Sequence, residues 1–246
     1  MSANESLQLL IELRSRLIRA LIFLFAVFAV FLYFANDLYT LLAEPLLRYL
    51  PSGHLIATQI VSPFFVPFKL AFMAALMMVV PYFLQQFWLF IAPALYQHEK
   101  RTLWPFLFAS ALLFYAGIAF AYFVIFPMLF HFLAKVVPSG VVFSPDIKEY
   151  LDFTMKLLLI FGGLFEIPIV MLVLVLLNVI TCDRLIAYRR YAFLGAFIIG
   201  MLLAPPDVFS QTVLAIPIWL LYEFGLLLTK FIKRSAHDES GQSSTD

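Results

Sequence analysis

Glu166 is the residue of this chain whose type and position most clearly point to a function. It is the only charged residue in the apolar segment 157–182, which is long enough to cross a lipid bilayer as a helix. A carboxylate at bilayer depth costs about 2.5–3.5 kcal/mol on insertion scales, so it must face other helices or a water-filled cavity. The sequence therefore predicts a functional, sheltered carboxylate. A protonated carboxyl that only hydrogen-bonds within a helix bundle is the alternative.

Two further carboxylates, Glu12 and Glu99, are predicted to lie on one face of the membrane. Glu12 belongs to a segment in which Leu9, Leu13 and Leu17 form an apolar stripe, typical of an amphipathic helix at the interface. Glu99 lies in the loop after the second apolar segment. Such a pair suits a ligand with guanidinium groups, because arginine–carboxylate contacts are bidentate and directional. A solvated loop charge is the alternative for Glu99.

The composition places these carboxylates in a membrane protein. Charged residues make up 13% of the chain and hydrophobic residues 64%, with a mean hydropathy of +0.99, whereas soluble proteins have about 25% charged residues. A net charge of +1 gives no basic stripe for nucleic acid. A single cysteine, Cys182, excludes an internal disulfide and a thiolate metal cage. We therefore expect an all-α polytopic membrane protein with no metal and no cofactor.

The apolar segments predict six transmembrane helices in a single membrane domain, residues 1–232, followed by a disordered cytoplasmic tail at 233–246. The expected spans are about 20–36, 70–93, 104–134, 157–180, 190–204 and 208–228. An even number of spans returns both termini to one side. Eleven of the 16 basic residues fall on that side, so the positive-inside rule predicts cytoplasmic termini.

The lengths of three spans and their prolines predict an irregular bundle. The third span would be about 50 Å long as a straight helix, so it must tilt, project or bend, with Pro127 as a candidate bend. The last two spans would reach only about 24 and 22 Å, which predicts a thinned bilayer or, alternatively, a re-entrant hairpin. Pro81, Pro168 and Pro217 also interrupt apolar segments, and such bends favour a concave wall near Glu166.

Five motifs recur in order along the chain: IELRSRL (11–17), FIAPALYQHEKR (90–101), FAYFVIFP (120–127), FGGLFEIPIV (161–170) and APPDVFSQTVLAIPIWLLYE (204–223). Together they resemble the TatC family, the signal-peptide-binding core of the twin-arginine protein translocase. The resemblance implies six helices in a concave, cupped arrangement in the bacterial inner membrane. It further implies a multimeric complex with TatA- and TatB-like single-span partners, which exports folded proteins using the protonmotive force.

The resemblance also implies roles for individual residues. Signal-peptide binding falls on Glu12, Arg14, Phe90, Pro93, Glu99, Lys100 and Arg101. Glu166 and Tyr122 match polar positions of the concave face. Gln211 matches a polar position where partner helices dock, and we expect Met201 and Leu202, with Gly195 and Gly200, to pack beside it.

Two loop residues, Pro45 and Asp207, match further positions that the family uses, and two positions depart from the family pattern. Leu9 stands where the family usually has histidine, which suggests that this histidine is dispensable for recognition. Ala204 stands where it usually has threonine, which removes one hydroxyl from the docking region.

Two other classes of protein compete with this interpretation. A proton-coupled secondary transporter would also place a carboxylate within the membrane, but the chain shows no convincing internal repeat. An intramembrane hydrolase would need a catalytic group set, and His98-Glu99 lacks the second histidine of HExxH. The sequence therefore favours a binding and translocation protein over an enzyme.

Overall fold

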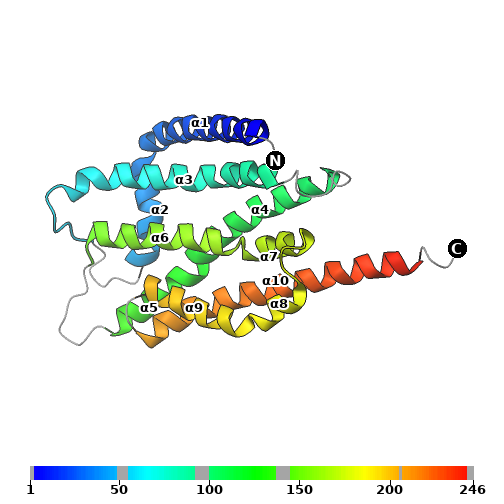
Figure 1. Cartoon of the computed structure of the whole chain (residues 1–246). Coiled ribbons are helices and arrows are strands. Elements are labelled where there is room, and N and C mark those ends of the chain that lie inside the picture. The colour runs from blue at the N-terminus through cyan, green and yellow to red at the C-terminus, as the bar shows by residue number, and fades with distance from the viewer. Residues whose placement is uncertain (1–2, 49–54, 92–99, 137–144, 205–206, 243–246) are drawn as a thin grey trace. The chain divides into compact units, whose positions relative to one another are not determined.

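The computed structural model describes residues 3–48, 55–91, 100–136, 145–204 and 207–242, and within these ranges it is built of helices and short connections (Figure 1). The elements are α1 (Ala3–Tyr33), α2 (Ala35–Leu47), α3 (Ser62–Ile91), α4 (Lys100–Phe120), the π-helical η2 (Ala121–Ile125), α5 (Phe126–Val136), α6 (Ile147–Leu164), α7 (Ile167–Leu176), α8 (Cys182–Ala187), α9 (Arg189–Leu203) and α10 (Val208–Gln242). Contacts divide them into two units, Met1–Pro93 with Pro138–Lys156, and Ala94–Val137 with Leu157–Asp246.

The first unit is organised by the antiparallel pair α1 and α3, which lie side by side (Figure 1). Leu24 of α1 is buried against Ala75 and Val79 of α3, and the small side chain of Ala75 permits close approach of the two helices. The rings of Phe28 and Phe72 meet edge to face on the same seam. The amphipathic segment and the first span therefore form one helix, α1, which no glycine or proline interrupts.

The second unit is organised by α10, which packs against both α9 and α7. Ala196 of α9 is buried with Ala215 and Ile218 of α10. On the other side, a Cβ at Gly225 of α10 would lie 2.7 Å from the sulfur of Met171 in α7. Small residues at these crossings let three helices approach to backbone distance, as in many membrane bundles.

The four prolines predicted to interrupt apolar segments behave differently from one another. Before Pro127 the chain widens into the π-helical turn η2, because proline has no N–H and its ring clashes with the carbonyl four residues earlier. Pro168 lies in the first turn of α7, directly after a break between α6 and α7. In contrast, α3 and α10 continue through Pro81 and Pro217.

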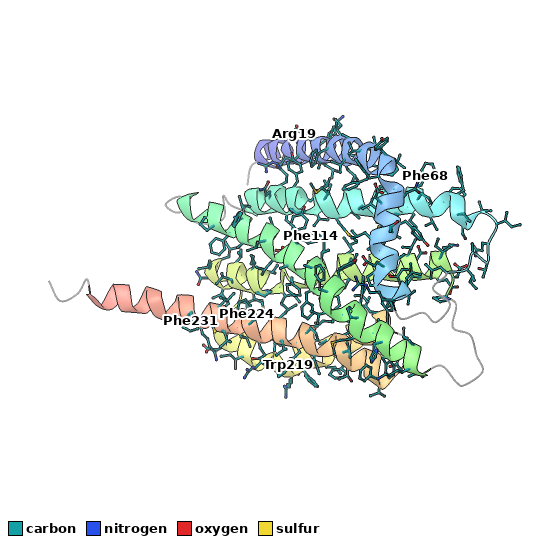
Figure 2. All side chains as sticks on the ribbon, turned by 180° about the vertical axis from the view of Figure 1, so that it is seen from behind. Arg19, Phe68, Phe114, Trp219, Phe224 and Phe231 are labelled. Carbon is teal, nitrogen blue, oxygen red and sulfur yellow. The ribbon has the colours of Figure 1, made fainter. Side chains whose placement is uncertain are left out.

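Five stretches of the described chain are long and apolar enough to cross a membrane. They are Arg14–Tyr33, Ser62–Gln86, Pro105–Val136, Ile147–Leu176 and Val208–Phe231. Large apolar side chains are exposed along these helices, as expected for a surface in contact with lipid (Figure 2). The prediction of an all-α polytopic membrane protein is confirmed. The remaining predicted span, α9, has only 15 residues, so the six-span count and the cupped arrangement stay predictions.

Several boundaries differ from those expected. The sixth span is longer than expected, because the apolar stretch Val208–Phe231 has 24 residues. The helix α10 itself continues beyond that stretch to Gln242. Residues 233–242, which were expected to belong to a disordered tail, are helical in α10. Residues 243–246 lie outside the described chain. Lys69 does not begin a span but lies inside α3, where its ammonium pairs with Asp152 of α6 at 2.6 Å.

Candidate functional site

Glu166 is buried at the break between α6 and α7, with 5% of its surface exposed. Its Oε2 atom accepts a hydrogen bond of 2.7 Å from the hydroxyl of Ser110 on α4. Its Oε1 atom is buried and has no hydrogen-bond partner in the described part of the chain. The sequence predicted that Glu166 would lie in the middle of a continuous helix. In the structure it lies at the start of α7, because Pro168 interrupts the backbone hydrogen bonds there.

Two glycines bring α4 close enough to α6 for this hydrogen bond. A Cβ at Gly117 would lie 2.5 Å from the carbonyl oxygen of Phe161, and a Cβ at Gly162 would lie 2.7 Å from the ring of Phe114. The side chains of Phe114 (marked in Figure 2) and Phe161 are almost fully buried at this crossing. Glu166 is therefore held among tightly packed apolar groups, where an unpaired oxygen is expensive to bury.

An aromatic cluster on α4 and η2 lies next to the crossing of α4 and α6. The ring of Phe120 lies 6.0 Å from that of Phe161 and 5.5 Å from that of Phe165, between ring centroids. Tyr122 is half-buried on η2, with its ring 4.9 Å from that of Phe123. Tyr122 lies in the π-helical turn that precedes Pro127, and its shared role with Glu166 stays a prediction.

Most of the expected signal-peptide-binding side chains lie outside the described residues. Arg14 is described and is exposed on α1. The backbone of α1, α3 and α4 places Glu12, Phe90, Lys100 and Arg101 on helices, but their side chains are outside the described set, as are Pro93 and Glu99 entirely. The joint site of Glu12 and Glu99 therefore stays a prediction.

The expected docking residues fall into two groups on the α9–α10 pair. Gln211 is engaged within the chain, since its Nε2 donates a hydrogen bond of 3.0 Å to the carbonyl of Phe197 on α9. Gly200 is also used internally, because a Cβ there would lie 2.9 Å from the backbone oxygen of Gln211. Met201 and Leu202, in contrast, are 57% and 75% exposed. The contact with Phe197 could not be predicted from the sequence, because the acceptor is a backbone carbonyl, which every residue has.

Pro45 and Asp207 both lie in or next to helices of the described chain. The expectation that Pro45 lies in a loop is wrong, because Pro45 is buried inside helix α2. The same helix is tied to α6, since the carbonyl of Leu42 accepts a hydrogen bond from the hydroxyl of Tyr150. Asp207 precedes α10, and its Oδ2 accepts a bond of 2.6 Å from the backbone N–H of Ser210, as N-terminal caps do. Any further role of these two residues stays a prediction.

Asp146 was missed by the sequence analysis although it joins two distant connections. It accepts hydrogen bonds from the backbone N–H (2.8 Å) and hydroxyl (2.6 Å) of Thr58, and from the N–H groups of Lys148 and Glu149. The hydroxyl bond from Thr58 is the main reason that the pKa of Asp146 is lowered from 3.8 to about 2. The spacing of Asp146 and Glu149 is that of a capping box, which was the available signal.

The described ranges contain no group of three or more His, Cys, Asp or Glu side chains placed to hold a metal ion. What the described site offers is a buried carboxylate with one occupied and one open oxygen, on a helical membrane scaffold. Such a site can accept a proton or a hydrogen-bond donor from an incoming chain.

Known proteins match this chain along nearly its whole length. The family model for Sec-independent protein translocase protein (TatC) matches residues 8–217. The chain is 49% identical over 238 residues to the Sec-independent protein translocase protein TatC of Haemophilus influenzae, with 96% of this chain and 93% of that protein covered. It is 50% identical over 223 residues to the protein of the same name from Escherichia coli K12, with 90% and 86% covered.

A solved structure described as the twin arginine translocase receptor TatC also matches. It has a TM-score of 0.81 and 39% identity, with 91% of this chain and 98% of that chain covered. Relatives of this similarity are membrane transport subunits and not enzymes. The chain therefore belongs to the TatC family of Sec-independent protein translocase proteins.

Proposed function

We propose that this chain is the signal-peptide-binding core of a twin-arginine translocase, located in the bacterial inner membrane with both termini in the cytoplasm. It binds twin-arginine signal peptides and organises TatA- and TatB-like partners for export of folded proteins, driven by the protonmotive force. The observation that carries this proposal is the match over 91% of the chain to a twin arginine translocase receptor. The buried carboxylate of Glu166, with its open oxygen, supports it.

Recognition of the paired arginines is assigned to Glu12 and Glu99. Each carboxylate can accept two parallel hydrogen bonds from a guanidinium group, a geometry that the lysine ammonium cannot reproduce. Arg14, Lys100 and Arg101 are the basic sequence neighbours of these two carboxylates, and we assign the hold on a cationic peptide to Glu12 and Glu99 themselves. Phe90 and Pro93 supply apolar contact for the residues that follow the arginine pair.

The test is crosslinking of a twin-arginine peptide to the full chain in membranes. Removal of either Glu12 or Glu99 should cost about 1.5–3 kcal/mol, which is about ten- to a hundredfold in affinity. Glu149→Ala is a matched control, because Glu149 is an exposed carboxylate at the start of α6. Unchanged crosslinking in a Glu12→Ala, Glu99→Ala double variant, or equal binding of a Lys-Lys peptide, would contradict the assignment.

Glu166 is assigned to the step after surface recognition. Its Oε1 atom is buried without a partner in the described chain, and a buried unsatisfied group costs about 1–3 kcal/mol. A polar group from the inserted signal peptide or from a partner helix would remove that cost. Glu166→Ala should therefore retain arginine-dependent peptide binding and lose transport. Loss of peptide binding together with transport would show that the two steps are not separable.

The exposed edge of α9 is assigned to partner docking. Met201 and Leu202 present apolar surface there, and a Cβ at Gly195 would meet nothing within 4 Å, so a second helix can approach closely. Gln211 sets the spacing of α9 and α10 through Phe197 and is expected to act on the partner indirectly. Disulfide mapping with cysteines along α9 tests this, and crosslinks that cluster on α1 instead would refute it.

A further inference from the structure

A cavity of about 380 Å³ lies beside the first turns of α3, within the first unit. Its walls combine two basic residues, Lys69 and Lys148, with the polar residues Gln59 and Ser62 and with Phe65 and Phe68. Figure 2 marks Phe68 on α3. The stretch of α3 that is long and apolar enough to cross a membrane begins at Ser62. On that basis we place the cavity at the level where lipid headgroups meet the hydrocarbon.

The polar wall of the cavity is positively charged and fixed in place. The ammonium of Lys148 donates a bond of 2.9 Å to Oε1 of Gln59, a neutral acceptor. Lys69 is neutralised by Asp152, 2.6 Å away. None of the described lining residues is acidic. Lys148 therefore supplies a positive charge that the described wall does not balance.

The position of this wall depends on pairing between two distant connections. Ile56 bridges to Asp146, and the N–H of Ile147 donates a bond of 2.9 Å to the carbonyl of Ile56. The bonds from Thr58 to Asp146 add to this pairing. Gln59 is thereby held next to Lys148, so the charged wall is built in advance of any ligand.

The opposite side of the cavity is aromatic and open to the surroundings. Phe65 is 60% exposed, and its ring lies 5.3 Å from that of Phe64, which lies 5.3 Å from that of Phe68. These rings cover the first two turns of a membrane-spanning helix, where acyl chains begin. A charged wall at headgroup level, next to exposed aromatic rings at acyl-chain level, matches the two ends of one kind of molecule.

We propose that this cavity binds an anionic phospholipid. The lipid phosphate contacts the ammonium of Lys148, the hydroxyls of the headgroup contact Gln59 and Ser62, and the acyl chains lie along the phenylalanines of α3. A free phosphate would use the lysine but leave Phe65 and Phe68 uncovered. Charge complementarity and the level of the cavity in the membrane therefore favour a lipid over a soluble anion.

The test measures lipid binding by the purified full chain in a neutral detergent. Native mass spectrometry follows retention of phosphatidylglycerol, with phosphatidylcholine of the same acyl chains as the zwitterionic comparison. Lys148→Gln should weaken phosphatidylglycerol binding about fivefold, corresponding to about 1 kcal/mol for one basic residue at an anionic surface. Lys135→Gln, which removes an exposed lysine at the end of α5, is the matched control and should change nothing.

A second measurement identifies the occupant directly. A photoreactive benzoyl-phenylalanine placed at position 65 should crosslink to phosphatidylglycerol, and glycerol phosphate without acyl chains should not compete. Equal retention of the two lipids, or equal effects of Lys148→Gln and Lys135→Gln, would overturn the proposal. Competition by glycerol phosphate would do the same, as would photoadducts to a second copy of the chain or to another protein. Equal thermal midpoints of the two lysine variants confirm that both are folded.

Discussion

Replacing Gly200 by alanine tests the α9–α10 contact that supports the proposed docking edge. An alanine Cβ at 200 would lie 2.9 Å from the backbone oxygen of Gln211, and real Cβ atoms essentially never approach below 3.0 Å. The obstructing atom belongs to the backbone, so it cannot rotate away, and the two helices must separate. Gly195, on the same helix, is the matched control, because a Cβ there would meet nothing within 4 Å.

The expected size of the effect follows from comparing the two glycines. Each glycine-to-alanine change gains up to about 1 kcal/mol of helix propensity. Only Gly200→Ala adds overpacking, which typically costs about 1–3 kcal/mol. The shared gain cancels in the difference, so Gly200→Ala should be less stable than Gly195→Ala by about 1–3 kcal/mol. Separation also lengthens the 3.0 Å bond from Gln211 to Phe197, a contribution of about 0.6 kcal/mol.

Two assays read out the result. The free energy of unfolding in detergent gives the stability difference, and disulfide mapping between α9 and a single-span partner gives the position of docking. Gly200→Ala should shift or weaken crosslinks from Leu202. Gly195→Ala is the control for the stability measurement only, because Gly195 itself lies on the proposed docking edge. Equal stability of both variants would refute the close approach of α9 and α10. Lower stability with unchanged partner crosslinks would refute the link between helix spacing and docking.

Three further predictions concern polar contacts. Ser110→Ala and Glu166→Ala should be coupled by about 1.5–3 kcal/mol in a double-mutant cycle of unfolding, whereas additivity within about 0.5 kcal/mol would disprove their hydrogen bond. Asp146 has a folded pKa of about 2, below its ordinary 3.8, so its stabilisation is complete above pH 3.8 and is lost as pH falls toward 2. The fall in thermal midpoint between pH 6 and pH 2.5 should therefore be smaller in Asp146→Asn than in the unsubstituted chain. Arg189→Gln leaves the half-buried Glu223 without its bidentate partner, so the thermal midpoint should fall and then recover on adding Glu223→Gln; equal midpoints for the single and double variants would contradict this.

The sequence by itself determined the class of protein and the regions that enter the membrane. Hydropathy depends only on the residues of a segment, so the membrane helices could be predicted without knowing which other helices they contact. The lone charge at Glu166 reported a buried carboxylate for the same reason, because its cost depends on depth in the membrane and not on a particular partner. The motifs around Glu12, Glu99 and Glu166 pointed to the family that the comparisons confirmed.

Only the tertiary structure decided which groups meet. Glu166 pairs with Ser110 across 56 residues of sequence, and Asp146 pairs with Thr58 across 88. The amide of Gln211 donates a hydrogen bond to the backbone carbonyl of Phe197. Every residue has such a carbonyl, so the sequence does not indicate which one is the acceptor. Some helices also begin at other residues than predicted. Lys69 was expected to precede a helix, but it lies inside α3, where Asp152 neutralises its charge. Local pattern sets which segments become helices, but hydrogen-bond and packing partners depend on contacts between segments far apart in the chain, which local pattern does not contain.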